Sequence, residues 1–166
     1  MLNVMSAARY ENVRALCHAL RNKDDGAAIK NAAELLYPLL PHTVWIIPVP
    51  SHNGTAEVTL RLAQMLQIEA MLRHDKIVGI IPGLAGKARE SLYEYKKAGK
   101  DISLVELGLY ATQNLKELTS LARRQSIPVI LLDIVVDTGT TAMAAAHATG
   151  ISDILCVGTT GNHQDL

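Results

Sequence analysis

Residues 129–142 read Val-Ile-Leu-Leu-Asp-Ile-Val-Val-Asp-Thr-Gly-Thr-Thr-Ala, and they contain the strongest strand pattern of the chain. Its first half, 129–136, is a mostly apolar run typical of a strand buried on both faces of a parallel sheet. The hydroxyl-rich turn 137–141 follows, and the alanine-rich residues 142–149 predict a helix that ends at Gly150. A strand, a turn and a helix in this order predict an α/β fold with a central, mostly parallel sheet flanked by helices.

The rest of the chain alternates between strand and helix patterns. Helices are expected at 10–40 (with a break at 24–26), 56–66, 87–98 and 112–125, and strands at 43–49, 68–72, 77–81, 102–107 and 153–158. No linker or internal repeat divides the chain. We therefore expect one domain over residues 1–166, with a helical N-terminal segment (1–42) and an α/β core (43–166).

The composition excludes several classes of protein. The 166 residues are 49% hydrophobic and 19% charged, which excludes a disordered chain. Sixteen basic residues balance sixteen acidic ones, so nucleic acid is not expected as a partner. We expect a cytoplasmic protein, because we find neither a signal peptide nor an apolar run long enough to span a bilayer. The two cysteines and six histidines show no metal-ligand spacing, and no metal-ligating residue is predicted.

The turn 137–141 has the residue types of a phosphate-binding loop. Ligands of open α/β sheets bind beyond the carboxyl ends of the strands, and a helix N-terminus offers unpaired N–H groups. Gly139 allows close approach of a ligand, and Asp133 is placed to accept hydrogen bonds from sugar hydroxyls. Three side chains add hydroxyl groups: Thr138, Thr140 and Thr141. The simpler alternative is a strand-to-helix turn with a threonine cap, in which Asp133 is a turn carboxylate.

This segment resembles the phosphoribosyl-pyrophosphate (PRPP) loop of the type I phosphoribosyltransferases. The family pattern is an apolar strand, two acids, two apolar residues, a variable residue, Thr-Gly, a variable residue and Thr. The sequence departs from it at Ile134, where the family usually has its second acid. It matches at Asp133, Val135, Val136, Thr138, Gly139 and Thr141. Residues 10–50 are similar to ComF-type members, without the N-terminal zinc module that many of them carry.

The resemblance implies that the protein transfers a phosphoribosyl group from magnesium-bound PRPP to a nitrogen acceptor, such as a purine-like base. Asp133 would then bind a ribose hydroxyl, and Asp137 would handle a proton of the base, so both count as catalytic residues. The 5′-phosphate would be held by Thr138, Gly139, Thr140 and Thr141. The pyrophosphate loop would fall at 51–55, with Ser51, His52 and Asn53 as contacts. A mobile flap would fall at 87–100, with Lys87 and Arg89.

Two departures from the family pattern favour a second hypothesis. Ile134 removes one carboxylate, and residues 51–55 contain neither Lys nor Arg. The alternative is a non-catalytic PRPP- or nucleotide-binding regulatory module of the same fold. The charges of 87–100 have a simpler interpretation too, as a solvated helix face. A homodimer is possible through the aliphatic N-terminal helices.

Overall fold

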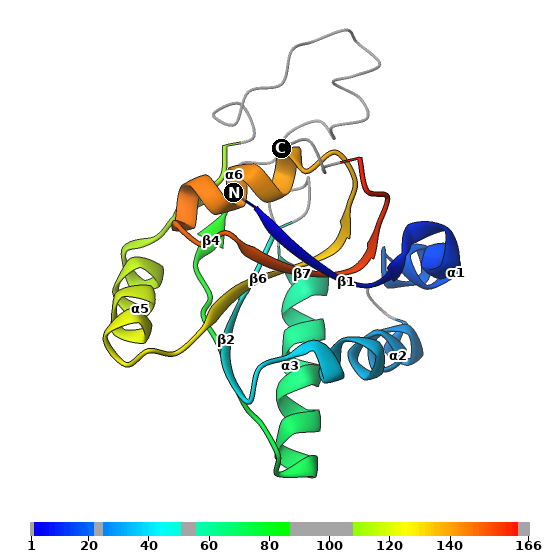
Figure 1. Ribbon diagram of the computed structural model, residues 1–166, viewed down its shortest axis with the longest axis horizontal. Coiled ribbons are helices and arrows are strands. Elements are labelled where there is room, and N and C mark those ends of the chain that lie inside the picture. Colours follow the sequence, from blue (N-terminus) through cyan, green and yellow to red (C-terminus); the bar gives the residue numbers. More distant parts are fainter. Residues whose placement is uncertain (1, 22–24, 51–55, 87–107, 163–166) are drawn as a thin grey trace, which may run out of the picture.

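A computed structural model describes residues 2–21, 25–50, 56–86 and 108–162, and its core is a five-stranded sheet with helices on both faces (Figure 1). The α/β class predicted from the sequence is confirmed. The elements are β1 (Asn3–Arg9), α1 (Tyr10–Arg21), α2 (Gly26–Leu36), the 3-10 helix η1 (Tyr37–Leu39), β2 (Thr43–Pro48), α3 (Glu57–Arg73), β3 (Ile77–Ile80), β4 (Leu84–Ala85), β5 (Tyr110–Ala111), α5 (Gln113–Arg124), β6 (Val129–Val136), α6 (Thr140–Thr149) and β7 (Asp153–Thr159).

The sheet is parallel throughout, in the order β1-β7-β6-β2-β3. The strand expected at 129–136 is β6, and it lies in the middle of the sheet. Its neighbours are β2, where Ile46 pairs with Ile130, and β7, where Cys156 pairs with Asp133. A central strand has helices over both faces, which explains why β6 is an almost continuous apolar run.

Two layers of helix cover the sheet. Helices α1, α2 and α3 cover one face, toward which Ile130 and Leu132 of β6 point. Helices α5 and α6 cover the other face, toward which Val129 and Leu131 point. The alternation follows from the two-residue period of a strand. Each fully buried aliphatic side chain of this kind stabilises the fold by about 1.5–3 kcal/mol.

The strand expected at 68–72 is wrong, because α3 continues without interruption to Arg73. The residues after Leu66 are mostly good helix formers, and no Gly or Pro ends the helix there. The Gln67 side chain also donates a hydrogen bond to the Val78 carbonyl at 2.9 Å, which ties this region of the helix to β3. The helix ends at His74, which has a left-handed backbone conformation.

The N-terminal residues contain a strand that the sequence analysis missed. The described residues of the expected helical segment 10–40 form α1, α2 and η1, but β1 precedes them and pairs with β7. The N-terminal segment therefore contributes an edge strand to the sheet in addition to two helices. The helix expected at 87–98 and the strand expected at 102–107 lie outside the described residues.

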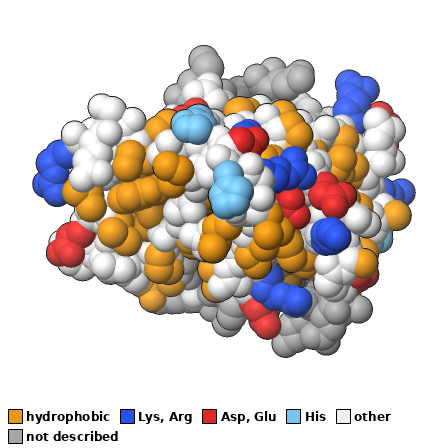
Figure 2. Space-filling model, turned by 90° about the horizontal axis from the view of Figure 1, so that it is seen from below, with side chains coloured by type: hydrophobic (Ala, Val, Ile, Leu, Met, Phe, Trp, Pro, Cys, Tyr) orange, Lys and Arg blue, Asp and Glu red, His pale blue; other side chains and the backbone are white. Residues whose placement is uncertain are grey.

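The end of the molecule opposite the β6–α6 turn is seen from below in Figure 2, where hydrophobic side chains gather in a patch on the left and lie among charged ones on the right. It carries the lower end of α3 and the starts of β2 and β3. Within the stretches of chain that the structure describes, no helix combines the length and the apolar character needed to cross a membrane.

Candidate functional site

The predicted site lies where the connections of the sheet change direction. Strand β2 connects through α3 to β3 on one side, whereas its neighbour β6 connects through α6 to β7 on the other side and on the opposite face. The pairing of β2 with β6 continues to the carboxyl end, where Val49 N–H donates to the Leu132 carbonyl at 2.9 Å. In open α/β sheets this switch point, beyond the carboxyl ends of the strands, is where ligands bind.

The turn after β6 has a geometry that depends on glycine. Gly139 is the N-cap of α6 and has a φ of 85°, in the left-handed region. Its carbonyl accepts the first helical hydrogen bond, from Met143 N–H at 2.8 Å. No side-chain hydrogen bond caps the helix. The N-cap of α6 is therefore Gly139 and not a threonine, and the first turn of the helix supplies backbone N–H groups of the kind that can bind an anion.

The structure brings the predicted hydroxyl groups together around Gly139. The Thr138 and Thr140 hydroxyl oxygens lie 3.1 Å apart, and Thr138 Oγ1 also accepts from Thr140 N–H at the long distance of 3.5 Å. Gly139 is buried, and Thr138, Thr140 and Thr141 are partly buried. Because a hydroxyl both donates and accepts, this group can offer hydrogens to a phosphate after a small rotation of the side chains.

Asp137 is held by a second turn that the sequence analysis missed. Its Oδ1 accepts hydrogen bonds from the Thr160 hydroxyl at 2.7 Å and from Asn162 Nδ2 at 2.9 Å. Both donors follow β7, at the same edge of the sheet. A signal for them exists in the sequence, because residues 159–162 (Thr-Thr-Gly-Asn) repeat the Thr-Gly chemistry of 138–141 after an apolar strand.

Asp133 has a different environment from the exposed Asp137. It lies within β6, paired in register with Cys156 of β7, and its Oδ1 accepts from Ile134 N–H at 2.8 Å. The residue keeps some exposed surface, but its carboxyl group is closely surrounded by protein. This burial raises the pKa of Asp133 to about 7. At neutral pH the carboxyl is therefore half protonated, and it can donate as well as accept a hydrogen bond.

Ile134, at the position of the family's usual second acid, is partly buried and packs against the core beneath α1–α3. The structure thus places no carboxylate of β6 beside Asp133 at this position. Cys17 and Cys156 are buried free thiols. Burial raises the pKa of both, to about 11 for Cys156, so neither is suited to act as a nucleophile.

Five predicted contacts fall outside the described residues: Ser51, His52, Asn53, Lys87 and Arg89. The described residues next to the second of these segments are nevertheless well fixed. Strands β4 and β5 form an antiparallel pair that contacts α6, and Thr112 N–H donates to the Gly83 carbonyl at 2.9 Å. The chain before residue 87 and after residue 107 is thus anchored beside the helix that carries the candidate loop.

A hollow of about 330 Å³ lies elsewhere, on the outer face of α5, and none of the predicted site residues line it. Its lining is polar and charged, as is usual for the solvated face of an amphipathic helix. The residues are Gln113, Lys116, Glu117, Ser120 and Arg124. Among the described residues, no group of three or more His, Cys, Asp or Glu is arranged to hold a metal ion.

Comparison with models of known protein families finds no match, and no curated protein matches the sequence. The candidate site therefore rests on its own geometry and on the resemblance of its loop.

Proposed function

We propose that the protein is a phosphoribosyltransferase that transfers the phosphoribosyl group of Mg-PRPP to a nitrogen acceptor. The observation that carries this proposal is the start of α6 at the switch point, where the left-handed Gly139 opens a helix with no side-chain cap. A phosphate group fits such a site, because backbone N–H groups and the helix dipole both favour an anion there. The resemblance of residues 133–141 to the PRPP loop supplies the particular substrate.

In this proposal the two acids have separate tasks. Asp133, buried below the loop, binds a ribose hydroxyl. Asp137, at the exposed end of the strand, faces the acceptor base and takes a proton from its ring nitrogen. Its hydrogen bonds from Thr160 and Asn162 orient the carboxylate. The transition state of such a transfer has oxocarbenium-like charge, so most of the catalysis would come from positioning and charge stabilisation.

Magnesium fits this site only as a partner of the substrate. The described residues offer no cluster of ligands for a resident ion. Magnesium commonly takes few protein carboxylates and completes its coordination with water and substrate phosphates. When bound, the ion would neutralise the pyrophosphate and make it a better leaving group. The predicted flap residues Lys87 and Arg89 would add positive charge on the same side.

The second candidate function is a non-catalytic binder of PRPP or a nucleotide. Two observations favour it over the enzyme. Ile134 gives no second carboxylate at the ribose, and Asp137 is already engaged by hydrogen bonds from Thr160 and Asn162 of the surface turn. Either function needs the same loop, so the first experiment tests the loop and the second tests turnover.

The loop is tested by calorimetric titration of PRPP, with and without magnesium, into the wild type and two glycine variants. Gly139→Ala adds a side chain to the loop at a residue with a φ of 85°, and under this proposal it is expected to weaken PRPP binding about tenfold or more. Gly150→Ala is the matched control, because Gly150 has a φ of 74° at the other end of the same helix. Both variants should lose about 1–2 kcal/mol of stability. Equal PRPP affinity in the two variants would contradict the proposed phosphate site.

Turnover is tested with Asp137→Asn in an assay for pyrophosphate release with nucleobase acceptors. The enzyme hypothesis predicts that the wild type releases pyrophosphate and that the variant loses this activity but still binds PRPP. Thr160→Val keeps the carboxylate but removes a hydrogen bond that orients it, so this variant should retain more pyrophosphate release than Asp137→Asn. Magnesium-dependent PRPP binding without pyrophosphate release from any nucleobase would favour the regulatory module.

A further inference from the structure

The outer side of β1 is an open edge of the sheet. β1 is the terminal strand in the order β1-β7-β6-β2-β3. In Figure 1 it crosses in front of the rest of the sheet. Helices α1 and α2 contact β1, and Met5 and Ala7 pack against the core beneath these helices. Residues 4–8 are all partly exposed. Over residues 2–21, 25–50, 56–86 and 108–162, no strand pairs with this side of β1.

The hydrogen-bonding groups on this side can be assigned from the register. Asn3 N–H donates to the Ser152 carbonyl at 2.8 Å, toward β7. Because backbone groups alternate along a strand, the N–H and C=O groups of Val4, Ser6 and Ala8 point away from β7. The Ala8 carbonyl accepts the Ser6 hydroxyl at 2.6 Å and has a second lone pair to offer. The edge thus presents backbone donors and acceptors to a further strand.

This edge lacks the usual protection against pairing. Proteins commonly blunt a free edge with Lys, Pro, a bulge or a very short strand. The opposite edge follows that rule, because β3 has only the four residues Ile77–Ile80. In contrast, β1 has seven residues, with no Pro or Lys, and its only charge is at the end, on Arg9. Its register with β7 runs from Asn3 to Ser6 and continues at Ala8 and Arg9.

We propose that β1 pairs antiparallel with β1 of a second copy, around a two-fold axis at Ser6. The two sheets then form one continuous sheet across the dimer. A two-fold interface brings the same element of both copies together, and for an edge strand this requires antiparallel pairing. Centred on Ser6, the pairing places Val4 of each copy opposite Ala8 of the other. Every outward-pointing N–H group on the edge then faces an outward-pointing carbonyl.

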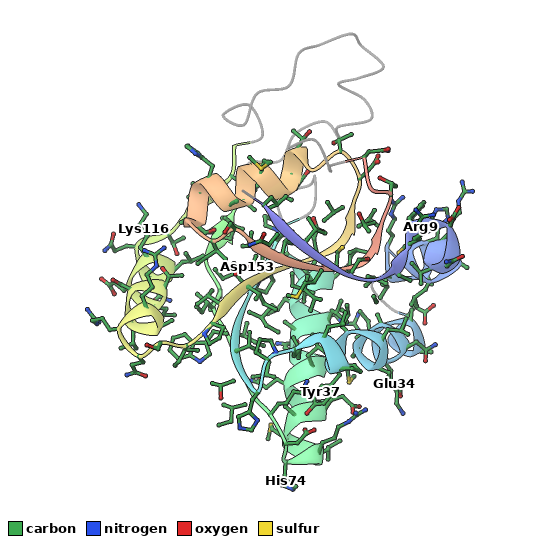
Figure 3. The ribbon with its side chains drawn as sticks, viewed as in Figure 1. Arg9, Glu34, Tyr37, His74, Lys116 and Asp153 are labelled. Atoms are coloured by element: carbon green, nitrogen blue, oxygen red, sulfur yellow. The ribbon has the colours of Figure 1, made fainter. Side chains whose placement is uncertain are left out.

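The charges at the two ends of the edge favour a second copy as the occupant. The Arg9 side chain is 80% exposed, with its own Glu11 at 3.5 Å. At the other end, Asp153 is exposed and accepts from Asn3 Nδ2 at 2.9 Å. Figure 3 shows Arg9 and Asp153 at opposite ends of the β1–β7 pair. Antiparallel pairing brings Arg9 of each copy beside Asn3 and Asp153 of the other. The interface then contains two pairs of opposite charges, each formed by Arg9 of one copy and Asp153 of the other.

The proposal is tested by light scattering coupled to size-exclusion chromatography and by analytical ultracentrifugation. The wild type should have twice the chain mass of 18.0 kDa. Ser6→Pro removes an N–H group that points outward, which an edge strand tolerates. It also removes the hydroxyl that donates to the Ala8 carbonyl at 2.6 Å and to the Val157 carbonyl at 3.4 Å, so Ser6→Ala, which loses the hydroxyl alone, is its control. The Ser6→Pro variant should keep the wild-type circular dichroism spectrum and be monomeric. A wild type that is monomeric at all concentrations, or a folded Ser6→Pro variant that dimerises as tightly as the wild type, would overturn the proposal.

A charge exchange provides a second test that does not alter the backbone. Arg9→Glu places like charges together at both ends of the interface and should weaken dimerisation about tenfold. Adding Asp153→Arg to the same chain exchanges the two charges and should restore most of the affinity. If neither Arg9→Glu nor the added Asp153→Arg changes the dimer affinity, the dimer uses a different surface, such as the N-terminal helices. That result would also contradict the pairing through β1.

Discussion

The two ends of the central sheet use polar residues in opposite ways. At the amino end, Tyr37 is only 2% exposed and its hydroxyl donates to the Asp75 carboxylate. Lys76 Nζ donates to the carbonyls of Tyr37 and Leu40 at 2.8 and 2.7 Å. At the carboxyl end, Asp137 is exposed and is held by two side chains of a surface turn. Polar groups at the amino end serve the fold, whereas those at the carboxyl end remain accessible to a ligand.

Electrostatic interactions also hold the Tyr37 side chain in place at the amino end of the sheet. Arg73 lies 4.4 Å and Lys76 4.8 Å from the centre of the Tyr37 ring, as cation–π contacts. Loss of solvent around the Tyr37 hydroxyl and its hydrogen bond to Asp75 raise the pKa of Tyr37 to about 12. Tyr37 and His74 both appear near the lower end of α3 in Figure 3, far from the turn after β6. This separation makes stability and ligand binding independently testable.

The largest effect on folding stability is expected for Asp133, which lies within β6, before the carboxyl end of that strand. Its pKa rises from 3.8 for a solvated carboxyl to about 7 in the fold, a difference worth about 4 kcal/mol. Between these values the folded state binds more protons than the unfolded state, so stability falls as the pH rises and then levels off above about 7. Asp133→Asn should remove this slope and be more stable than the wild type at a pH of about 8.

This prediction is checked by urea unfolding at several pH values between about 4 and 8, the range over which this carboxyl titrates. The control is Glu117→Gln, which neutralises an exposed carboxylate of α5 and should leave the slope unchanged. A wild-type stability that increases between pH values of about 5 and 7, or an equal slope in Asp133→Asn, would show that the carboxyl is ionised and well solvated in the fold.

The second prediction concerns the amino end of the sheet, where we expect a substitution to lower the stability of the fold. Tyr37→Ala removes a buried ring together with its bond to Asp75 and both cation contacts, and should destabilise the fold by about 3 kcal/mol. Thermal and urea unfolding measure the loss. Tyr110→Ala is the control, because Tyr110 is 52% exposed and should change stability by less than about 0.5 kcal/mol. If the Tyr37→Ala protein folds but has an altered PRPP affinity, stability and ligand binding do not depend on separate ends of the sheet.

The smallest effect is expected at the carboxyl end. Thr160→Val removes the hydrogen bond to the exposed Asp137 and the one that the Thr160 hydroxyl accepts from Asn162 N–H at 3.3 Å. Because water can replace both exposed partners, the substitution should cost only about 0.5 kcal/mol. The same unfolding measurements check it. A loss as large as that of Tyr37→Ala would mean that the turn after β7 is a structural element of the core, and the contrast between the two ends would then be wrong.

Local sequence patterns were sufficient where neighbouring residues decide the structure. The apolar run of β6 and the turn to α6 are of this kind, and so is α5, whose N-cap Thr112 accepts from Leu115 N–H. The error at 68–72 arose because a short apolar run has no clear period. What ended the helix was the left-handed His74, not a Gly or Pro.

Long-range contacts explain what the sequence could not predict. The residues of β1 (Asn-Val-Met-Ser-Ala-Ala-Arg) have little intrinsic preference for a strand, and only their pairing with β7 makes them one. The hydrogen bonds of Thr160 and Asn162 to Asp137 also join residues 23 and 25 positions apart. The hydroxyl-rich turn 137–141 could be predicted from the sequence. The hydrogen-bond partners of Asp137 could not, because they depend on β6 and β7 being neighbours in the sheet.

The pairing of β1 with β7 has a consequence for how the chain folds during synthesis. Asn3 pairs with Asp153, so β1 takes its place in the sheet only after β7, which lies 150 residues later in the chain, has been made. Until then, β1 has no place in the sheet and one side of β6 is uncovered. Contacts this distant in sequence slow folding and leave unpaired edges exposed to other chains. We therefore expect a chain that stops before β7 to aggregate on the ribosome or soon after release, even though most of its core residues are present.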